Sequence, residues 1–329
     1  MAWLVEDRYT TSLAKSSLGF FITTFFNLLA SGGLLGMITE GTFNGVDGTE
    51  LFFRVIEPLT APKAAVIVIH GHGDHSGGMH NLSAGLVNHE YSVYAFDLRG
   101  HGKSAGKRGF IQSWDEFSGD LHEFRKLVSF DQPNLPLYIV GHSIGGLITL
   151  EYALEHSMGI SGIVAIAPAI SYEVTSVEQL GISLMNRIKP DYSIKKSGRI
   201  RLLKKKSAIR AKYESDSLRH NIVTPGLGHS LIQAISRVIN KASSITLPFL
   251  LQFGLDDKIT PPTKLRYFFN LVSSKDKQLV EYSLSRHRPF DEVGRETFLG
   301  DLVGWLDQQN DKQQKEITRS SDRKVRFPL

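Results

Sequence analysis

A serine between two glycines is the residue in this sequence best placed for nucleophilic catalysis. Ser143 lies in the pattern Gly-x-Ser-x-Gly at residues 141–145, after the β-prone run 137–140 and before the helix-like stretch 147–156. Glycines on both sides let the chain turn sharply from strand to helix, so that the serine hydroxyl stands clear of the sheet. Such a serine needs a histidine to accept its proton and an acid to orient that histidine.

A second Gly-x-Ser-x-Gly match surrounds Ser104, but its neighbours do not fit the same turn. Ser104 is separated from the predicted strand 91–98 by Arg-Gly-His-Gly, and the Lys-Arg-Gly that follows the match is a poor start for a helix. We therefore expect Ser143 to be the nucleophile.

Candidates for the acid and the histidine lie downstream of Ser143. A predicted strand, 247–253, is followed by the adjacent aspartates Asp256 and Asp257, either of which fits a loop that presents an acid. His287 is the only histidine after them in the sequence. The strand-end position of these residues makes them the predicted partners of the serine.

A histidine-rich segment after the predicted strand 64–69 supports two different chemistries. Residues 70–78 read His-Gly-His-Gly-Asp-His-Ser-Gly-Gly. In one interpretation their backbone N–H groups bind the oxyanion that forms in acyl transfer. In the other, their side chains hold a metal ion that activates water. The ligands of that alternative, a metal-dependent hydrolase, are His70, His72, Asp74, His75 and His142.

Strand-like and helix-like segments alternate from residue 42 onwards. The run 64–69 is fully apolar, which is typical of a strand buried on both faces in a parallel sheet. This alternation predicts a doubly wound α/β fold. Further strands are expected at 91–96, 137–140, 160–167, 247–253 and 278–282, and helices at 114–129 and 262–272.

With these segments assembled, residues 40–307 resemble the monoacylglycerol lipase and lysophospholipase branch of the serine α/β-hydrolases. The Asp-x-Arg-Gly-x-Gly-x-Ser segment at 97–104 is part of this resemblance and favours the serine chemistry over the metal site. The other matching segments are 40–43, 70–77, 106–109, 141–146 and 213–218.

The resemblance implies the α/β-hydrolase fold, with a mostly parallel central sheet flanked by helices and an inserted helical cap at about 170–245. Its Gly-x-x-Asp pattern selects Asp257 over Asp256. It further implies hydrolysis of single-chain acyl esters, such as monoacylglycerol or a lysophospholipid, with no cofactor and no metal. The implied catalytic triad is Ser143, Asp257 and His287, and the implied oxyanion hole is formed by the backbone N–H groups of His72 and Ile144.

Two residues depart from the family pattern. His72 occupies a position that is commonly small or apolar, and Arg288 follows the predicted catalytic histidine where an acidic residue is usual. Other α/β-hydrolases, including prolyl aminopeptidases and short-chain esterases, share the triad. A non-catalytic binding protein would keep this fold without turnover, but such proteins often lack a member of the triad, and none is missing here. These classes remain alternatives to the lipase function.

Charge and hydropathy predict contact with a membrane. The net charge is +5, but eleven Lys or Arg residues and one acidic residue lie within 187–212, so the basic character is local. Together with interleaved apolar residues, this stretch predicts adhesion to a membrane surface, whereas no motif indicates nucleic acid binding. The chain has no cysteine, which excludes disulfides and thiol catalysis.

The two ends of the chain are expected to lie outside the hydrolase domain. Residues 1–39 include the apolar stretch 18–38, which predicts a helix that spans a membrane, lies on its surface or docks on the body. We therefore expect a membrane-associated protein on the cytoplasmic face, with a soluble cytoplasmic protein as the alternative. The polar tail 308–329 is predicted to be disordered.

Within the predicted cap, the apolar residues Leu180, Leu184 and Ile188 recur at helical spacing. This spacing indicates an amphipathic helix. Its apolar side has two interpretations, either the exposed face of a lid or part of the core of the cap.

Overall fold

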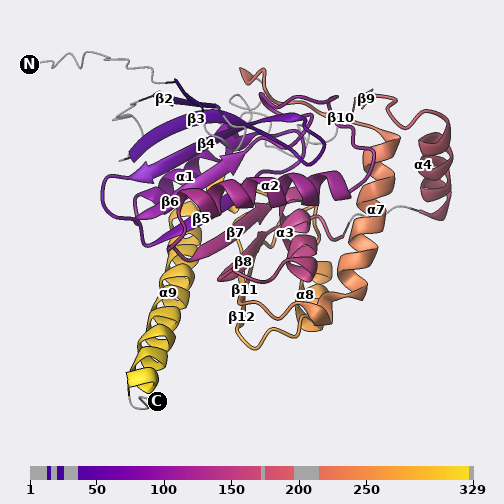
Figure 1. The fold of residues 1–329 in the computed structure, drawn as a ribbon. Helices are drawn as coiled ribbons and strands as arrows, with labels where there is room; N and C mark the ends of the chain where they lie inside the picture. The colour runs from indigo at the N-terminus through magenta and orange to yellow at the C-terminus, as the bar shows by residue number, and fades with distance from the viewer. Residues whose placement is uncertain (1–12, 16–20, 26–35, 172–174, 196–214, 326–329) are drawn as a thin grey trace, which may run out of the picture.

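The computed structural model describes residues 13–15, 21–25, 36–171, 175–195 and 215–325, and Figure 1 shows their arrangement. Within these residues ten strands form one sheet in the order β1-β2-β3-β4-β6-β5-β7-β8-β11-β12. Neighbouring strands are parallel along the run β6-β5-β7-β8-β11-β12 and antiparallel along the run β1-β2-β3-β4-β6. The strands are β1 Leu13–Lys15, β2 Phe21–Phe25, β3 Gly36–Asn44, β4 Glu50–Pro58, β5 Ala64–Ile69, β6 Tyr91–Phe96, β7 Leu137–His142, β8 Gly162–Ile166, β11 Phe249–Gly254 and β12 Lys277–Tyr282.

Helices cover both faces of this sheet, as expected for a doubly wound fold. The helices are α1 His80–Val87, α2 Asp115–Asp131, α3 Ile144–Glu155, α4 Ser176–Ile188, α7 Pro225–Asn240, α8 Pro262–Leu271 and α9 Arg295–Val325, with short 3₁₀ turns at Ser76–Met79, Ala242–Ser244 and Pro289–Asp291. The mostly parallel sheet and its helical layers confirm the predicted α/β-hydrolase fold.

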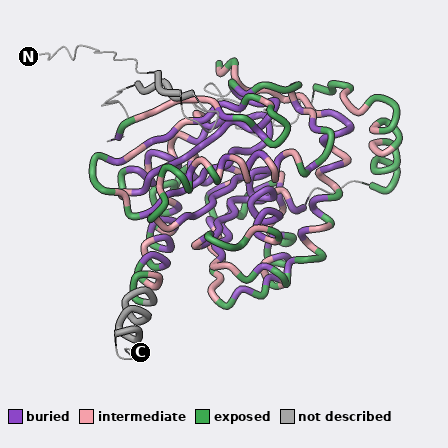
Figure 2. Tube along the Cα trace, viewed as in Figure 1, coloured by how far each residue is buried: buried purple, intermediate pink, exposed green. Residues whose placement is uncertain are grey.

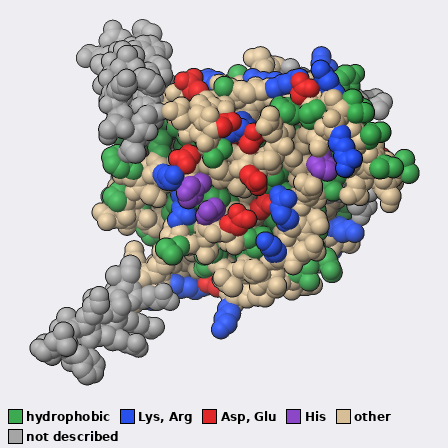
Figure 3. All heavy atoms as spheres, turned by 45° about the vertical axis from the view of Figure 1, so that its right-hand side comes forward, with side chains coloured by type: hydrophobic (Ala, Val, Ile, Leu, Met, Phe, Trp, Pro, Cys, Tyr) green, Lys and Arg blue, Asp and Glu red, His purple; other side chains and the backbone are tan. Residues whose placement is uncertain are grey.

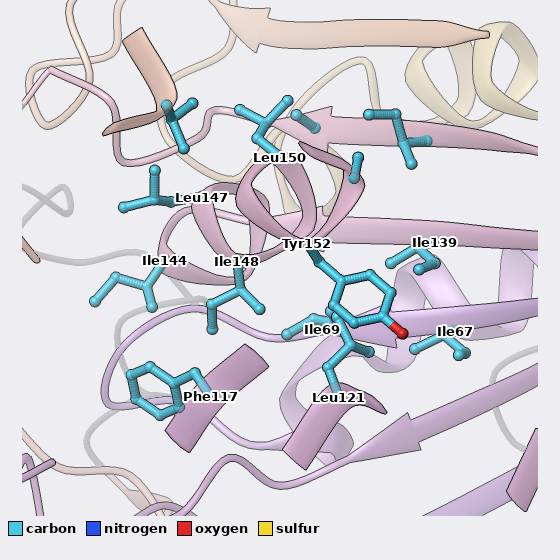
Figure 4. Packing of buried hydrophobic residues seen from close by; sticks show 14 of the residues in the cluster. Ile67, Ile69, Phe117, Leu121, Ile139, Ile144, Leu147, Ile148, Leu150 and Tyr152 are labelled. Carbon is cyan, nitrogen blue, oxygen red and sulfur yellow. The ribbon is translucent and has the colours of Figure 1, made fainter. Parts of the chain in front are cut away.

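The central strands are buried on both faces, which explains their continuous apolar sequence. All six residues of β5 are buried. Ile67 and Ile69 pack into the core beneath α2 and α3 (Figure 4), whereas Val66 and Val68 contact the core that α1 and α9 cover. Figure 2 shows the same pattern, with buried strands at the centre and exposure at the rim. The strand ends are thereby held rigidly at one edge of the sheet.

The apolar N-terminal stretch does not form the expected helix where the structure describes it. Phe21–Phe25 is strand β2, which pairs antiparallel with β3, and residues 36–38 begin β3. Ile22, Thr23 and Thr24 are β-branched and favour extended backbone, and the edge of the sheet offers hydrogen-bonding partners for it. The rest of the stretch 18–38 lies outside the described residues. Among the described residues, no helix is both long and apolar enough to cross a bilayer.

The prediction of a disordered tail from residue 308 is wrong as far as the structure describes it, because α9 continues to Val325. Its first turns bury Phe298, Leu302 and Leu306 against the sheet. Once these turns are fixed, adding the Gln- and Lys-rich residues that follow is inexpensive, since both are good helix formers. The side chain of Asn310 is also buried in this segment.

The chain between β8 and β11 forms a helical insertion, as predicted for 170–245. It contains α4, α7 and a two-strand pair formed by β9, Ile194–Lys195, and β10, Ile222–Val223. Most of the basic stretch 187–212 lies outside the described residues.

Only one side of helix α4 packs against α7. Ser183 lies 3.4 Å from His229 of α7, measured from its Oγ to the imidazole Nδ1. The opposite side carries Leu180, Leu184 and Ile188, which are 71%, 57% and 68% exposed. The apolar side of this helix is therefore an exposed face and not part of the core of the cap.

The position of Asn310 generates a stability prediction. Its amide accepts a hydrogen bond from the Tyr138 hydroxyl at 2.8 Å and lies 3.3 Å from the Tyr91 hydroxyl. Replacing Asn310 with Ala leaves a buried hydroxyl with one partner fewer, and we expect the free energy of unfolding to fall by about 1–3 kcal/mol. Urea unfolding would measure this, with Lys315→Ala, an exposed change on the same helix, as the control. Equal stabilities of the two variants would contradict an integral role of this part of α9.

Candidate active site

Ser143 sits on a strained turn between β7 and α3. Its φ is +56°, a value that residues other than glycine rarely adopt. A side chain at Gly145 would lie 2.3 Å from the Ile69 carbonyl oxygen, so only glycine allows the turn to pack against the end of β5. The strand-turn-helix geometry predicted around Ser143 is therefore present.

The structure brings the side chains of Ser143, His287 and Asp257 into one hydrogen-bonded row. His287 Nε2 lies 3.0 Å from Ser143 Oγ, and His287 Nδ1 lies 2.7 Å from Asp257 Oδ2. A carboxylate can only accept hydrogen bonds, so Nδ1 carries the proton and Nε2 is left to accept the serine proton. This arrangement can activate a hydroxyl as a nucleophile.

The side chain of Asp257 is buried and held by its own loop. Its Oδ1 accepts hydrogen bonds from the backbone N–H groups of Ile259 at 2.7 Å and Thr260 at 3.1 Å. Burial raises the pKa of Asp257, but the hydrogen bonds from His287 and Thr260 outweigh it and hold the pKa below its ordinary value. The carboxylate is thus charged and fixed where it faces the imidazole. Its neighbour Asp256 is exposed.

Two backbone contacts position the loop that carries His287. The Asp256 N–H donates to the Ser285 carbonyl at 3.0 Å, which joins this loop to the aspartate loop. His142 Nε2 lies 2.9 Å from the carbonyl oxygen of His287. His142, considered above as a metal ligand, therefore contacts the backbone of the loop that carries His287. Nothing in the spacing of the sequence indicated this contact.

The loop that follows β5 runs directly beside Ser143. A side chain added at Gly71 would lie 3.1 Å from Ser143 Cβ, so the backbone of this loop passes close to the nucleophile. His72 comes next in the loop, and Ile144 is the first residue of α3. The loop that carries His72 and the first residue of α3 thus both lie beside the serine in the chain's fold.

The side chains of the histidine-rich segment do not gather around a common point. His70 Nε2 accepts a hydrogen bond from the Leu98 N–H at 2.9 Å, and His75 Nε2 lies 2.9 Å from Asp216 Oδ2. Among the described residues, no group of three or more histidine and carboxylate side chains is arranged to hold a metal ion. The geometry thus gives the metal alternative no assembled ligand set.

Asp74 instead lies in a buried network of charges. Its Oδ2 is 2.5 Å from Arg288 Nη1, and its Oδ1 is 3.0 Å from Arg219 Nη2. Burial would raise the pKa of Asp74, but the two guanidinium groups outweigh burial and lower the pKa from 3.8 to about 2. Arg288, noted above as a departure from the family pattern, therefore has a buried carboxylate partner.

Four imidazole rings pack together, two from the loop after β5, His70 and His72, and two from elsewhere in the chain, His101 and His220. The ring centroid of His101 lies 5.3 Å from that of His72, 5.4 Å from His70 and 4.6 Å from His220. Burial and the neighbouring imidazoles lower the pKa of His101 well below 6.5. The side chains of His101 and His220 were not singled out from the sequence, because only the fold brings the loop after β6 and the insertion next to the loop after β5.

The fold and this row of side chains define an α/β-hydrolase. Its family model, described as Hydrolase_4: Serine aminopeptidase, S33, matches residues 60–294, and the chain belongs to this family. This confirms the predicted superfamily.

Comparison with individual relatives indicates which group of α/β-hydrolases this chain resembles. The chain is 33% identical to "Monoglyceride lipase" of Rattus norvegicus over 73% of this chain and 80% of that protein. It is 28% identical to "Monoacylglycerol lipase" of Mycolicibacterium smegmatis over 82% of this chain and 96% of that protein. A crystal structure of the monoacylglycerol lipase of Paleococcus ferrophilus matches with a TM-score of 0.68 and 30% identity, covering 79% of this chain and 99% of that one. The chain is a carboxylic ester hydrolase of the monoglyceride lipase and esterase group.

The low pKa of Asp74 predicts how stability depends on pH. Because the folded-state pKa, about 2, lies below the ordinary 3.8, the charged network stabilises the fold above about pH 4, and this contribution is lost as the pH falls towards 2. Wild type should therefore lose unfolding free energy more steeply than Asp74→Asn between about pH 4 and pH 2. Urea titrations across this range would test it, with the exposed Asp311→Asn as control. Parallel profiles for wild type and Asp74→Asn would contradict the prediction.

Proposed function

We propose that this protein hydrolyses the ester bond of single-chain lipids, monoacylglycerols or lysophospholipids, through an acyl-enzyme on Ser143. The observation that carries the proposal is the row from Ser143 through His287 to Asp257, with hydrogen-bond distances of 3.0 and 2.7 Å. The substrate class is supported by the relatives named monoacylglycerol or monoglyceride lipase. The departures at His72 and Arg288 leave the three side chains of the row in place.

In the acylation step, Ser143 Oγ attacks the ester carbonyl while His287 Nε2 takes its proton. Asp257 stabilises the imidazolium that forms and keeps its ring in orientation. The same proton then passes from Nε2 to the leaving alcohol, which is glycerol or a glycerophosphate headgroup. The products of this step are the free alcohol and an acyl group bound to Ser143.

The tetrahedral intermediate carries a negative oxygen that needs hydrogen-bond donors. In our proposal this role falls to the backbone N–H groups of His72, in the loop beside the serine, and of Ile144, the residue after it. Each such donor contributes about 3–4 kcal/mol to transition-state stabilisation in other serine hydrolases. The N-terminus of α3, Ile144–Glu155, also faces the developing charge.

Deacylation repeats the same chemistry with water. His287 removes a proton from a water molecule, the water attacks the acyl carbonyl, and Ser143 leaves with the proton that His287 returns. The fatty acid is released and the serine is restored. Every proton transfer in this cycle uses the same imidazole, so no cofactor enters the scheme.

We also propose that α4 contacts the lipid surface that presents the substrate. Its exposed apolar side is bordered by the exposed basic residues Arg187 and Lys189, and Lys195 follows nearby. Figure 3 shows hydrophobic side chains reaching the surface among Lys and Arg side chains. An apolar helical face with flanking cations is suited to an anionic lipid interface. The described part of the N-terminal stretch lies in the sheet, so the proposal assigns the contact to the insertion.

Removing the nucleophile tests the mechanism. Ser143→Ala should lower kcat for a monoacylglycerol at least about 10⁴-fold, because no other group in the row can form the acyl-enzyme. Fatty acid release would be measured for a monoacylglycerol, a lysophospholipid, a short-chain ester and a prolyl amide, with circular dichroism to verify folding. A fluorophosphonate should inactivate wild type, and EDTA should not.

Three outcomes would count against this function. Turnover retained by folded Ser143→Ala would exclude the serine, and activity lost to EDTA but resistant to the fluorophosphonate would favour a metal-dependent hydrolase. Faster cleavage of the prolyl amide than of every ester would favour a peptidase.

Substitutions on α4 test the lipid contact. Leu180→Glu or Leu184→Glu should weaken binding to anionic vesicles about tenfold or more, because withdrawing one leucine from an apolar environment costs about 1.5–3 kcal/mol. Vesicle sedimentation would measure binding, and hydrolysis of a soluble short-chain ester should stay unchanged. The control is Met158→Glu, which changes an 87% exposed residue outside α4. Unchanged vesicle binding by both leucine variants would reject the contact.

A further inference from the structure

Arg288 connects the loop that carries His287 to the loop beside the nucleophile through its contacts with Asp74 and Gly78. Its Nη1 meets Asp74 Oδ2, its Nη2 donates to the Gly78 carbonyl at 2.7 Å, and its Nε donates to Asp291 Oδ2 at 2.6 Å. Arg288 and Asp74 are both buried. A planar guanidinium with five N–H donors can serve three such acceptors at once, which a lysine ammonium cannot do in the same geometry.

Asp74 is in turn shared with the insertion. Its second oxygen meets Arg219, whose Nε lies 3.1 Å from Asp216 Oδ2. The same Asp216 oxygen lies 2.9 Å from His75 Nε2, which returns the network to the loop after β5. One buried carboxylate therefore joins three segments that are distant in the sequence.

The space for this network depends on Gly78. A side chain at this position would lie 1.8 Å from Asp74 Oδ1 and 2.5 Å from Arg219 Nη2. A glycine in the 3₁₀ turn Ser76–Met79 therefore leaves the space in which Asp74 can contact both arginines. Since Gly78 also provides the carbonyl that Arg288 binds, the loop after β5 supplies two of the three acceptors of Arg288.

We propose that Arg288 is a positioning residue for the ester hydrolysis argued above, on which this inference rests. Through Asp74 it holds the loop of His287 against the loop that supplies the His72 N–H, with Arg219 locking the same carboxylate from the insertion. The contacts of His142 and Asp256 hold the His287 loop on its N-terminal side, and Arg288 holds it on the other. Without Arg288 the His287 imidazole is no longer held at the position where it meets Ser143 and faces the oxyanion donors.

The test compares Arg288→Gln, Arg288→Lys, Asp74→Asn and the double variant Asp74→Asn/Arg288→Gln, using a soluble short-chain ester. A slow-binding fluorophosphonate titrates the active sites, so that kcat is expressed per competent site. An arginine that only stabilises the fold would change the number of competent sites and leave kcat per site unchanged. A positioning residue lowers kcat per site.

We expect Arg288→Gln to lower kcat per site about 100-fold, the effect of moving a reacting group by about 1 Å, with KM within about twofold. Arg288→Lys should lose about tenfold, because charge is kept but the three-way contact is lost. The double variant should lose less than the product of the two single losses, since both changes remove the contact between Asp74 and Arg288. Arg266→Gln, which disrupts an exposed pair with Glu281, is the matched control and should leave kcat unchanged.

Arg288→Gln with kcat per site within about twofold of wild type, or a double variant whose loss is the product of the single losses, would overturn the proposal. If Arg288→Gln does not fold, Arg288→Lys decides: an unchanged kcat per site overturns the proposal and a lowered one supports it. Fluorophosphonate labelling of wild type but not of Ser143→Ala shows that the serine mechanism stands whatever Arg288 does.

Discussion

The hydrogen bond between Asp257 and His287 sets the geometry of the whole site, because it fixes both the position of the imidazole proton and the plane of the ring. At 2.7 Å it is a charge-assisted contact in a buried place, where such contacts are strong. It holds only if two loops meet, one after β11 and one after β12. These strands are parallel neighbours in the sheet, so their carboxyl ends lie side by side. The site is thus a consequence of strand order.

The same edge of the sheet collects the other parts of the site. The turn at Ser143 follows β7, and the loop with His72 follows β5, which pairs with β7. Rigid central strands, buried on both faces, keep these loop starts in fixed register. A reaction that depends on sub-ångström placement of a serine, an imidazole and two backbone N–H groups needs such a frame.

The buried polar side chains around the site form two groups, a charged network and a cluster of imidazoles. On the side of Asp74, full charges are buried but compensated, with one carboxylate between two guanidinium groups. On the side of His101, burial lowers the pKa of the imidazole and keeps it neutral. Removing one partner from the Asp74 network leaves a buried charge without compensation, which is far more costly than removing a surface ion pair. The loop with His72 lies between these two environments and is braced by both.

Much of this protein could be predicted from its sequence, because strong local signals carry the fold. Continuous Val and Ile runs indicated the parallel strands, and Gly-x-Ser-x-Gly indicated the turn at Ser143, since only glycines permit it. Chain order led to His287 and to the pair Asp256 and Asp257, the family resemblance selected Asp257, and the structure brings Asp257 and His287 together. Tertiary packing decided the rest: β2 is a strand because the edge of β3 offers it partners, and α9 continues past residue 308 because its first turns are anchored in the core. The meeting of Arg288, Asp74 and Arg219 belongs to the same class, since these residues are far apart in the chain and nothing in their spacing reveals that they share one buried space.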